Sequence, residues 1–358
     1  MIGWNAFVLL AAVNLAPPAA PPTPEQVMAV PEELRQQLQE RVINAANAPE
    51  QRLLRLVDLV FKPEGLGLQY DTTATLTVAE TWTQHRANCL SFSLLFVALA
   101  REAGLEAHIQ EVGQVVTWYQ EQGVIYNAGH VNVGLRVAGR RGTLDLDQNV
   151  LYDRRGPVVI TDQRALAHYY NNRGAELMAA HDDSAMDYLH AALRMDPSFA
   201  PAWNNLGVLE TRRGATVEAA SAFDNALRID PTLASALSNA TAFYLRQGDA
   251  GRAGQLGDRL QQVHNRDPFY QFMQGVAAER RGDYAKAVDG YRHAIRLYGN
   301  AHQFHFGLAR AYFLLGENQR AMREMARARE LGGSDRLRAI YQAKLDGLHR
   351  LNARQALH

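Results

Sequence analysis

The fold of the N-terminal part is decided by one segment, Asn88-Cys89-Leu90-Ser91-Phe92-Ser93-Leu94-Leu95-Phe96-Val97-Ala98-Leu99-Ala100-Arg101-Glu102, which contains the only cysteine of the chain. Between residues 90 and 100, apolar and small side chains occur on every face of a helix, and charge returns only at its end. Gly104 follows as a residue that readily ends a helix. The segment therefore predicts a helix buried in a hydrophobic core.

Cys89 lies in the first turn of this predicted helix. Unpaired backbone N–H groups and the positive end of the helix dipole favour a thiolate there, which suits a nucleophile. A free cysteine is also one of the most commonly buried residues, where it acts as a small hydrophobic side chain. The helix alone leaves both interpretations open.

The composition limits the kinds of ligand that the protein binds. The 358 residues include 37 basic and 37 acidic side chains, so no excess of positive charge favours nucleic acid or an anionic membrane. One cysteine excludes an intramolecular disulfide and a four-thiolate zinc site. The length allows two domains, and nothing in the sequence implies a cofactor.

Residues 1–24 have the pattern of a signal-like segment followed by a proline-rich linker. Residues 7–16 form an apolar run, and five prolines follow between residues 17 and 24. The pattern predicts an exported, periplasmic protein, although the absence of Lys or Arg before the run leaves a cytoplasmic location as the alternative. The run is too short to cross a bilayer as a helix, so we expect no integral membrane span.

Residues 25–164 combine helical and strand patterns. Apolar residues recur at helical spacing over 33–47 and 49–61, and Thr77 with Glu80 forms a capping-box pattern before the cysteine segment. The period then changes towards two, which predicts strands at 107–116, 124–127, 131–137, 142–146 and 158–160. Helices followed by an antiparallel meander predict an α+β domain.

From residue 165 the chain is helical and repetitive. Gly214, Gly248, Gly282 and Gly316 recur at one constant interval, which is the length of a tetratricopeptide repeat. The best copy resembles that repeat, whose marked positions it carries at Trp203, Leu206, Gly207, Gly214, Ala219, Phe223, Ala226 and Pro231. About five repeats are expected over residues 165–333, with a capping helix and tail at 334–358. The copy that begins near Ala236 is degenerate, because Leu237 and Thr241 replace the marked residues.

The resemblance to these repeats implies an all-α solenoid whose groove binds a protein or peptide partner. Amide, arginine and aromatic side chains suit a peptide with carboxylates and apolar groups. The residues predicted to face the groove include Asn204, Arg212, Phe272, Arg280, Phe306 and Arg310. His302 and His305 lie one helical turn apart, but no third ligand is evident, so we predict no metal site there.

A thiolate nucleophile needs a base, and the base needs an orienting partner. His130 is the best candidate base, since it opens a predicted strand where its side chain can face a cleft. Asp145 and Asp147 lie in the next predicted strand and share one of its faces. Either carboxylate could orient His130.

The order and spacing of these residues resemble the transglutaminase-like superfamily, which has a papain-like fold. A cysteine at the start of a buried helix is followed by a histidine on a strand and by an aspartate in the next strand, at positions 89, 130 and 145. The resemblance implies that Cys89 is the nucleophile, His130 the base and acid, and Asp145 the orienting carboxylate. It also implies an oxyanion hole with the Cys89 N–H, and a second donor that is weakly assigned to Gln84 or Trp82.

The resemblance covers a segment from about residue 65 to residue 147. Many such domains carry Trp or Tyr where this chain has Asn132. The expected function is acyl transfer at an amide. We expect hydrolysis, as in a cysteine peptidase or amidase, with the repeats recruiting a protein or peptide substrate. An amine-transferring crosslinker is one alternative, and a non-catalytic interaction scaffold with a degenerate transglutaminase-like domain is the other.

Overall fold

The computed structural model describes residues 20–71, 75–112, 119–121, 124–126, 130–146 and 156–355. The apolar run at 7–16 and Asp147 lie outside the described residues, so the predictions about them are not addressed. Within the described residues, no helix has the length and the apolar content needed to cross a membrane.

The helices of the N-terminal part surround α5, which begins at Cys89. Its apolar side chains are buried from Leu90 to Ala100, as the sequence predicts. α3 has the predicted bounds, whereas the helix predicted over 33–47 continues beyond α2 as a π-helical turn, η1. The elements are α1 (Pro24–Met28), α2 (Glu32–Leu38), η1 (Gln39–Ile43), α3 (Pro49–Phe61), α4 (Val78–Gln84) and α5 (Cys89–Glu102).

A four-stranded antiparallel sheet packs against α5 in the order β7-β6-β3-β8. Val133 on β6 pairs with Ile109 on β3 and with Leu144 on β7. The sheet agrees with the predicted α+β class. Its strands are too few and too short to show that the domain has a papain-like fold. The strands are β3 (Glu106–Val112), β6 (His130–Val137), β7 (Arg140–Leu144) and β8 (Val158–Val159), besides the pairs β1 (Gln69–Tyr70) with β2 (Arg86–Ala87) and β4 (Tyr119–Glu121) with β5 (Val124–Tyr126).

Five consecutive helix pairs form the predicted repeats, and α16 follows them as the predicted capping helix. The four evenly spaced glycines all have φ between +77° and +79°, the left-handed conformation that lets each first helix end and turn back. The pairs are α6 (Asp162–Ala179) with α7 (Ala185–Met195), α8 (Ala200–Arg213) with α9 (Thr216–Ile229), α10 (Ala234–Arg246) with α11 (Ala250–Arg266), α12 (Pro268–Arg280) with α13 (Tyr284–Leu297), and α14 (His302–Leu314) with α15 (Asn318–Leu331); α16 spans Asp335–Gln355.

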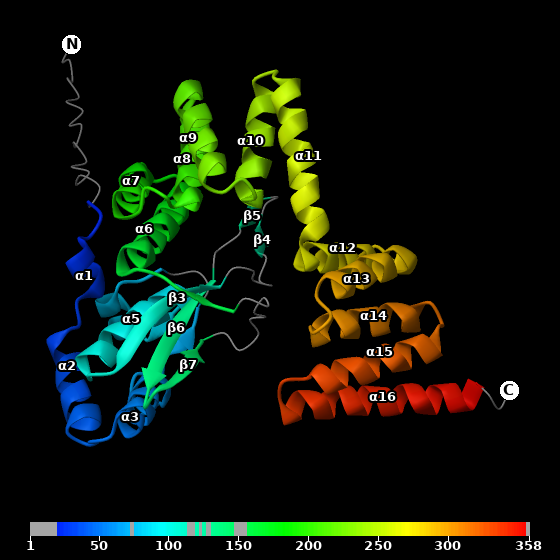
Figure 1. Ribbon diagram of the computed structural model, residues 1–358, viewed down its shortest axis with the longest axis horizontal. Coiled ribbons are helices and arrows are strands. Elements are labelled where there is room, and N and C mark those ends of the chain that lie inside the picture. Colours follow the sequence, from blue (N-terminus) through cyan, green and yellow to red (C-terminus); the bar gives the residue numbers. More distant parts are fainter. Residues whose placement is uncertain are drawn as a thin grey trace, which may run out of the picture.

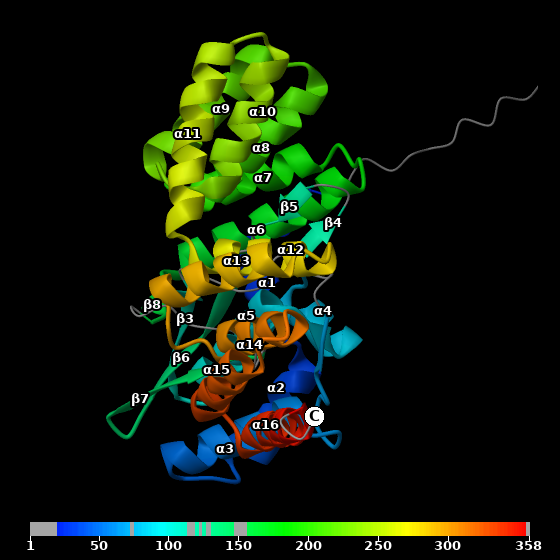
Figure 2. The ribbon, with the colours of Figure 1, turned by 90° about the vertical axis from the view of Figure 1, so that its right-hand side faces the viewer.

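The repeats bend around the N-terminal part. In Figure 1, α6 to α11 extend away from the sheet, and α12 to α16 then stack back down opposite it. Figure 2 agrees, since α14 to α16 lie in front of the N-terminal part when the molecule is viewed from that side. The β6 arrow points away from the repeats, so the strand begins, at His130, on the side towards them. The repeats therefore arch over the end of the sheet where β6 starts.

The N-terminal part and the first repeats share one hydrophobic core. The buried cluster that contains α5 continues through Ala165 to Tyr170 on α6 and reaches Phe199 and Ala202 at the start of α8. Tyr170 Oη also donates to the Pro22 carbonyl, at 2.6 Å. The boundary predicted at residue 165 falls inside α6, so the two parts are joined by a packed helix.

A partly buried polar cluster, which we call the Glu111 clamp, joins β3 to the repeats. The Glu111 carboxylate accepts hydrogen bonds from Arg164 Nε at 2.7 Å and His168 Nε2 at 2.6 Å, both on α6. Arg164 also donates to Asp196 at 2.8 Å, and its guanidinium lies over the Phe199 ring. The clamp is next to the strand pair that carries His130, because Val112 pairs with His130.

Candidate active site

Cys89 is fixed by the first turn of α5. Asn88 caps the helix, since its side chain accepts from the Ser91 N–H at 2.8 Å and donates to Thr75 Oγ1 at 2.9 Å. Ser93 Oγ donates to the Cys89 carbonyl at 2.7 Å. These bonds hold the backbone of Cys89 at the helix N-terminus, while its side chain stays partly accessible.

His130 lies between Cys89 and Asp145. It is the first residue of β6 and is only 4% exposed. Its Nε2 donates to Asp145 Oδ2 at 2.6 Å, and the side chain of Cys89 also interacts with the ring and favours its protonated form. Because Asp145 occupies Nε2, Nδ1 is the nitrogen left for the thiol. The structure thus brings together the three residues that the transglutaminase-like resemblance implied, whereas the residues alone left Asp145 and Asp147 open.

The surroundings of His130 favour its protonated form. Burial opposes the imidazolium, but the hydrogen bonds and charges of Asp145 and Cys89 outweigh it and raise the pKa of His130 to about 10. An imidazolium held between a carboxylate and a thiol can stabilise a thiolate, which is the arrangement that cysteine nucleophiles use.

Asn132 makes a contact that the sequence analysis missed. Its Nδ2 donates to Asp145 Oδ2 at 3.3 Å, and the residue is fully buried. The available signal was its position, because residues 130 and 132 lie two apart on one strand and share a face. In the sequence, Asn132 stands out only as a departure from the Trp or Tyr that is usual at this position.

The second oxyanion donor stays a prediction. Gln84 is exposed at the end of α4, and its Oε1 accepts from Arg86 Nε at 2.9 Å. Trp82 packs partly against the core, with its ring 5.9 Å from that of His85. No described contact links either side chain to Cys89.

The first helices of three consecutive repeats are linked by asparagine side chains. Asn204, predicted to face the groove, is buried, donates to Asn205 at 3.2 Å and accepts from Asn239 at 3.0 Å. Asn205 in turn donates to Asn171 at 2.9 Å. These amides form a continuous chain from α10 through α8 to α6, which we call the amide chain.

The other residues predicted for the groove differ in what they contact. Arg212 donates to the Met178 carbonyl at 2.8 Å, and Phe272 packs between helices with its ring 4.9 Å from that of Phe304. Arg310 pairs with Glu279 and, like Lys344, lies over the Phe306 ring. Arg280 is exposed.

His302 and His305 both have protein partners. His302 Nδ1 lies 2.8 Å from Tyr341 Oη, and His305 Nδ1 lies 2.7 Å from a Glu324 carboxylate oxygen. No group of three or more metal-binding side chains occurs among the residues that the structure describes.

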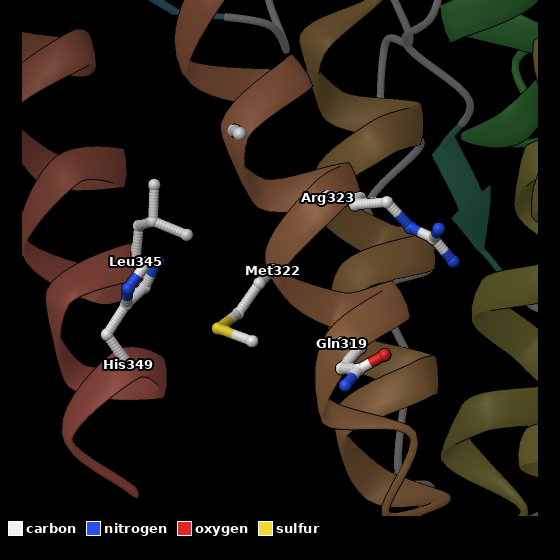
Figure 3. Close-up of a pocket in the computed structure, with 6 residues that line it drawn as sticks. Gln319, Met322, Arg323, Leu345 and His349 are labelled. Carbon is white, nitrogen blue, oxygen red and sulfur yellow. The ribbon is translucent and has the colours of Figure 1, made fainter. Parts of the chain in front are cut away.

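A shallow pocket lies between α15 and α16, at the far end of the repeats (Figure 3). Met322, Ala326 and Leu345 supply apolar surface, and Arg323 and His349 are polar residues beside it. It belongs to the end of the solenoid and contains none of the residues around Cys89.

The comparisons with known proteins concern the repeats. A tetratricopeptide-repeat family model matches residues 182–234 and 272–335. The unmatched stretch between them contains most of the degenerate pair α10 and α11. The search of curated proteins gives no match.

Several solved structures are similar to part of the chain at low identity. MamA is 18% identical over 46% of this chain and 91% of its own, with a TM-score of 0.26. YrrB, described as a TPR protein with an unusual peptide-binding site, is 16% identical over 49% and 92%, with a TM-score of 0.27. PilF of Pseudomonas aeruginosa is 19% identical over 53% and 87%, with a TM-score of 0.30.

The matched residues cover α7 to α9 and most of α12 to α15, and the family model does not reach the part that carries Cys89, His130 and Asp145. The even spacing of the repeats, the left-handed glycines and the paired helices agree with that match. The C-terminal part of the chain therefore consists of tetratricopeptide repeats.

Proposed function

We propose that the protein is a transglutaminase-like cysteine hydrolase, a peptidase or amidase whose repeats bind its polypeptide substrate. The observation that carries the proposal is the hydrogen bond from His130 to Asp145, together with the interaction of the same imidazole with Cys89 at the start of α5. A nucleophile, a base in contact with it and a carboxylate behind the base are the parts that acyl transfer requires.

In the proposed reaction the Cys89 sulfur attacks the carbonyl carbon of an amide, and His130 holds the thiol proton. The tetrahedral intermediate collapses as the C–N bond breaks, and His130 gives its proton to the leaving amine. Water then attacks the thioester while His130 accepts a proton from it. The carbon–sulfur bond breaks, releasing the carboxylic acid and returning the thiol.

The start of α5 supplies a donor for the developing oxyanion. The Cys89 N–H belongs to the first turn of α5, where backbone N–H groups lack partners within the helix. Such a donor stabilises the negative oxygen of the tetrahedral intermediate. Gln84 and Trp82 stay candidates for the second donor.

The repeats would hold the substrate near Cys89. The shared core and the Glu111 clamp fix the first repeats to the sheet, so a polypeptide bound along the arch keeps a defined position relative to the site. Binding energy gained there lowers the entropic cost of bringing the amide to the thiol.

The pH dependence of Cys89 alkylation by iodoacetamide tests the catalytic part. We expect the wild type to react well below pH 7 and the His130→Ala variant to react only near the ordinary thiol pKa of about 8.5. His349→Ala, on the exposed face of α16, is the matched control and should behave as the wild type. Identical profiles for wild type and His130→Ala would overturn the proposal.

The second candidate function is a non-catalytic interaction scaffold, and the amide chain favours it. Asn205 and Asn239 are partly exposed and keep hydrogen-bonding capacity beyond the bonds within the amide chain, which the backbone of an extended peptide could use. An alkylation profile without a reactive thiolate, combined with peptide binding that Asn205→Ala weakens, would support the scaffold over the hydrolase.

We also propose that the protein is exported, because its apolar run and proline-rich linker resemble a secretory signal. Fractionation of cells that express the full chain tests this proposal. Recovery with the periplasmic contents supports export, and recovery only with the cytoplasm contradicts it.

A further inference from the structure

One oxygen of Asp145 receives two hydrogen bonds from the same strand. His130 Nε2 donates to Oδ2 at 2.6 Å, and Asn132 Nδ2 donates to the same atom at 3.3 Å. Both donors lie on one face of β6, two positions apart. The carboxylate is thus held by its catalytic neighbour and by an amide that does not contact the thiol in any described bond.

Burying the side-chain amide of Asn132 lowers the stability of the folded protein. The residue is fully buried in the middle of the sheet, where its backbone pairs with Gln110 on β3. A buried amide loses its hydrogen bonds to water, and an apolar side chain would fill the same space without that loss. An amide at this position therefore indicates that the hydrogen bond donated by its NH₂ group to Asp145 has a function.

Asp145 needs an anchor of this kind. It follows the last described pair of β7, Val133 with Leu144, so the described strand pairing ends immediately before it. Its side chain is nevertheless only 11% exposed. Among its described contacts, the hydrogen bonds from His130 and Asn132 fix the position of the carboxylate. The bond from Asn132 stays the same when His130 gains or loses a proton.

We propose that Asn132 is a positioning residue, which holds Asp145 Oδ2 against His130 Nε2 so that the other ring nitrogen stays directed at Cys89. This inference rests on the proposed function. The Asn132 NH₂ group can only donate to this oxygen, so it favours the ionised carboxylate, which in turn accepts the hydrogen bond from His130 Nε2–H. A carboxylate fixed in this way keeps the imidazole in one orientation during proton transfer.

Replacing the amide should change the pH profile of Cys89. Asp145 and Cys89 are the side chains that do most to favour the protonated form of His130, so a displaced carboxylate weakens the imidazolium directly. Asn132→Leu removes the donor at similar size, and Asn132→Ala removes it without added bulk. Both should slow alkylation by iodoacetamide at pH 6 by about tenfold, as the loss of one hydrogen bond to a charged group implies.

Two further variants separate positioning from packing. Asn132→Thr keeps a hydroxyl donor and should stay within about threefold of the wild type at pH 6. Val133→Ala removes buried volume from the adjacent, opposite-facing position of β6. It should lower stability but leave the pH at which Cys89 becomes reactive unchanged, since its side chain lies on the face of β6 opposite to those of His130 and Asn132.

The outcomes distinguish this inference from the proposed function. If the wild type reacts at low pH, His130→Ala does not, and both donor-free variants keep the wild-type profile, the role of Asn132 is overturned and the hydrolase proposal stands. If the wild type itself shows no reactivity that depends on His130, the hydrolase proposal is overturned, and the role of Asn132 is overturned with it. Circular dichroism shows whether Asn132→Leu folds. If it does not, the alkylation profile of Asn132→Ala alone tests the role of Asn132.

Discussion

His130 Nε2 and Asp145 Oδ2 lie 2.6 Å apart although the two residues are 15 positions apart in the chain. The bond determines which ring nitrogen faces the thiol, and a neutral amide in place of the carboxylate can fix the wrong tautomer.

Asp145→Asn should therefore reduce catalysis by about 10²- to 10⁴-fold, the range for orienting carboxylates in such triads. Alkylation of Cys89 at pH 6 is the substrate-independent measurement, and we expect it to fall at least about tenfold. Asp258→Asn, on the exposed side of α11, is the matched control. Unchanged alkylation in Asp145→Asn would show that the carboxylate does not support the imidazole.

Stability should depend on pH through His130. Its pKa is raised from 6.5 in the unfolded chain to about 10 in the folded protein, so the folded state binds the proton more tightly. The resulting stabilisation is complete below about pH 6.5 and is lost as the pH rises through 10.

Urea unfolding of the wild type and His130→Ala at several pH values measures this contribution. We expect the difference in unfolding free energy between the two proteins to shrink steadily from pH 7 to pH 10. A difference that stays constant over this range would contradict the raised pKa.

Much of this architecture could be predicted from sequence because it repeats or follows a strong periodicity. Four evenly spaced glycines require turns at fixed intervals, and an all-apolar helix must be buried, so the repeats and α5 followed directly. The resemblance to transglutaminase-like domains also implied Cys89, His130 and Asp145, which the structure brings together.

Features that depend on contacts between distant segments could not be predicted. The strands β1 and β2 that pair with each other are too short for a periodic signal. Glu111 and His168 are 57 positions apart in the chain and meet only because α6 packs against the sheet. Phe272 has the spacing of a groove residue, yet its ring stacks on Phe304, because sequence spacing gives the face of a helix but not its neighbour.

The Glu111 clamp should make the stability of the folded protein sensitive to acid. Burial opposes ionisation of Glu111, but the hydrogen bonds and charges of His168 and Arg164 outweigh it and lower its pKa to about 2. The folded-state pKa is below the unfolded value of 4.5, so this stabilisation is present above pH 4.5 and is lost as the pH falls towards 2.

Glu111→Gln should lower the unfolding free energy at pH 7 by about 2 kcal/mol, because Arg164 and His168 lose a partly buried charged partner. Denaturant unfolding at pH 7 and pH 3 provides the measurement, and the difference from wild type should narrow at the lower pH. Glu106→Gln, on the same strand but exposed, should change stability by less than about 0.5 kcal/mol. Equal effects of the two substitutions would contradict a role for the clamp.

Gly207 tests how closely the paired helices of a repeat must approach. A methyl group on its Cα would lie 2.7 Å from the Phe223 ring, which is itself fully buried and cannot move aside. Gly207→Ala should therefore destabilise the protein by about 1–3 kcal/mol despite the higher helix propensity of alanine. Gly254→Ala in α11 is the matched control, since no described atom lies within 4 Å of its added methyl group, and it should stabilise by about 0.5–1 kcal/mol. Thermal unfolding of both variants measures the difference, and a stabilising Gly207→Ala would mean that α8 and α9 can separate without loss of packing.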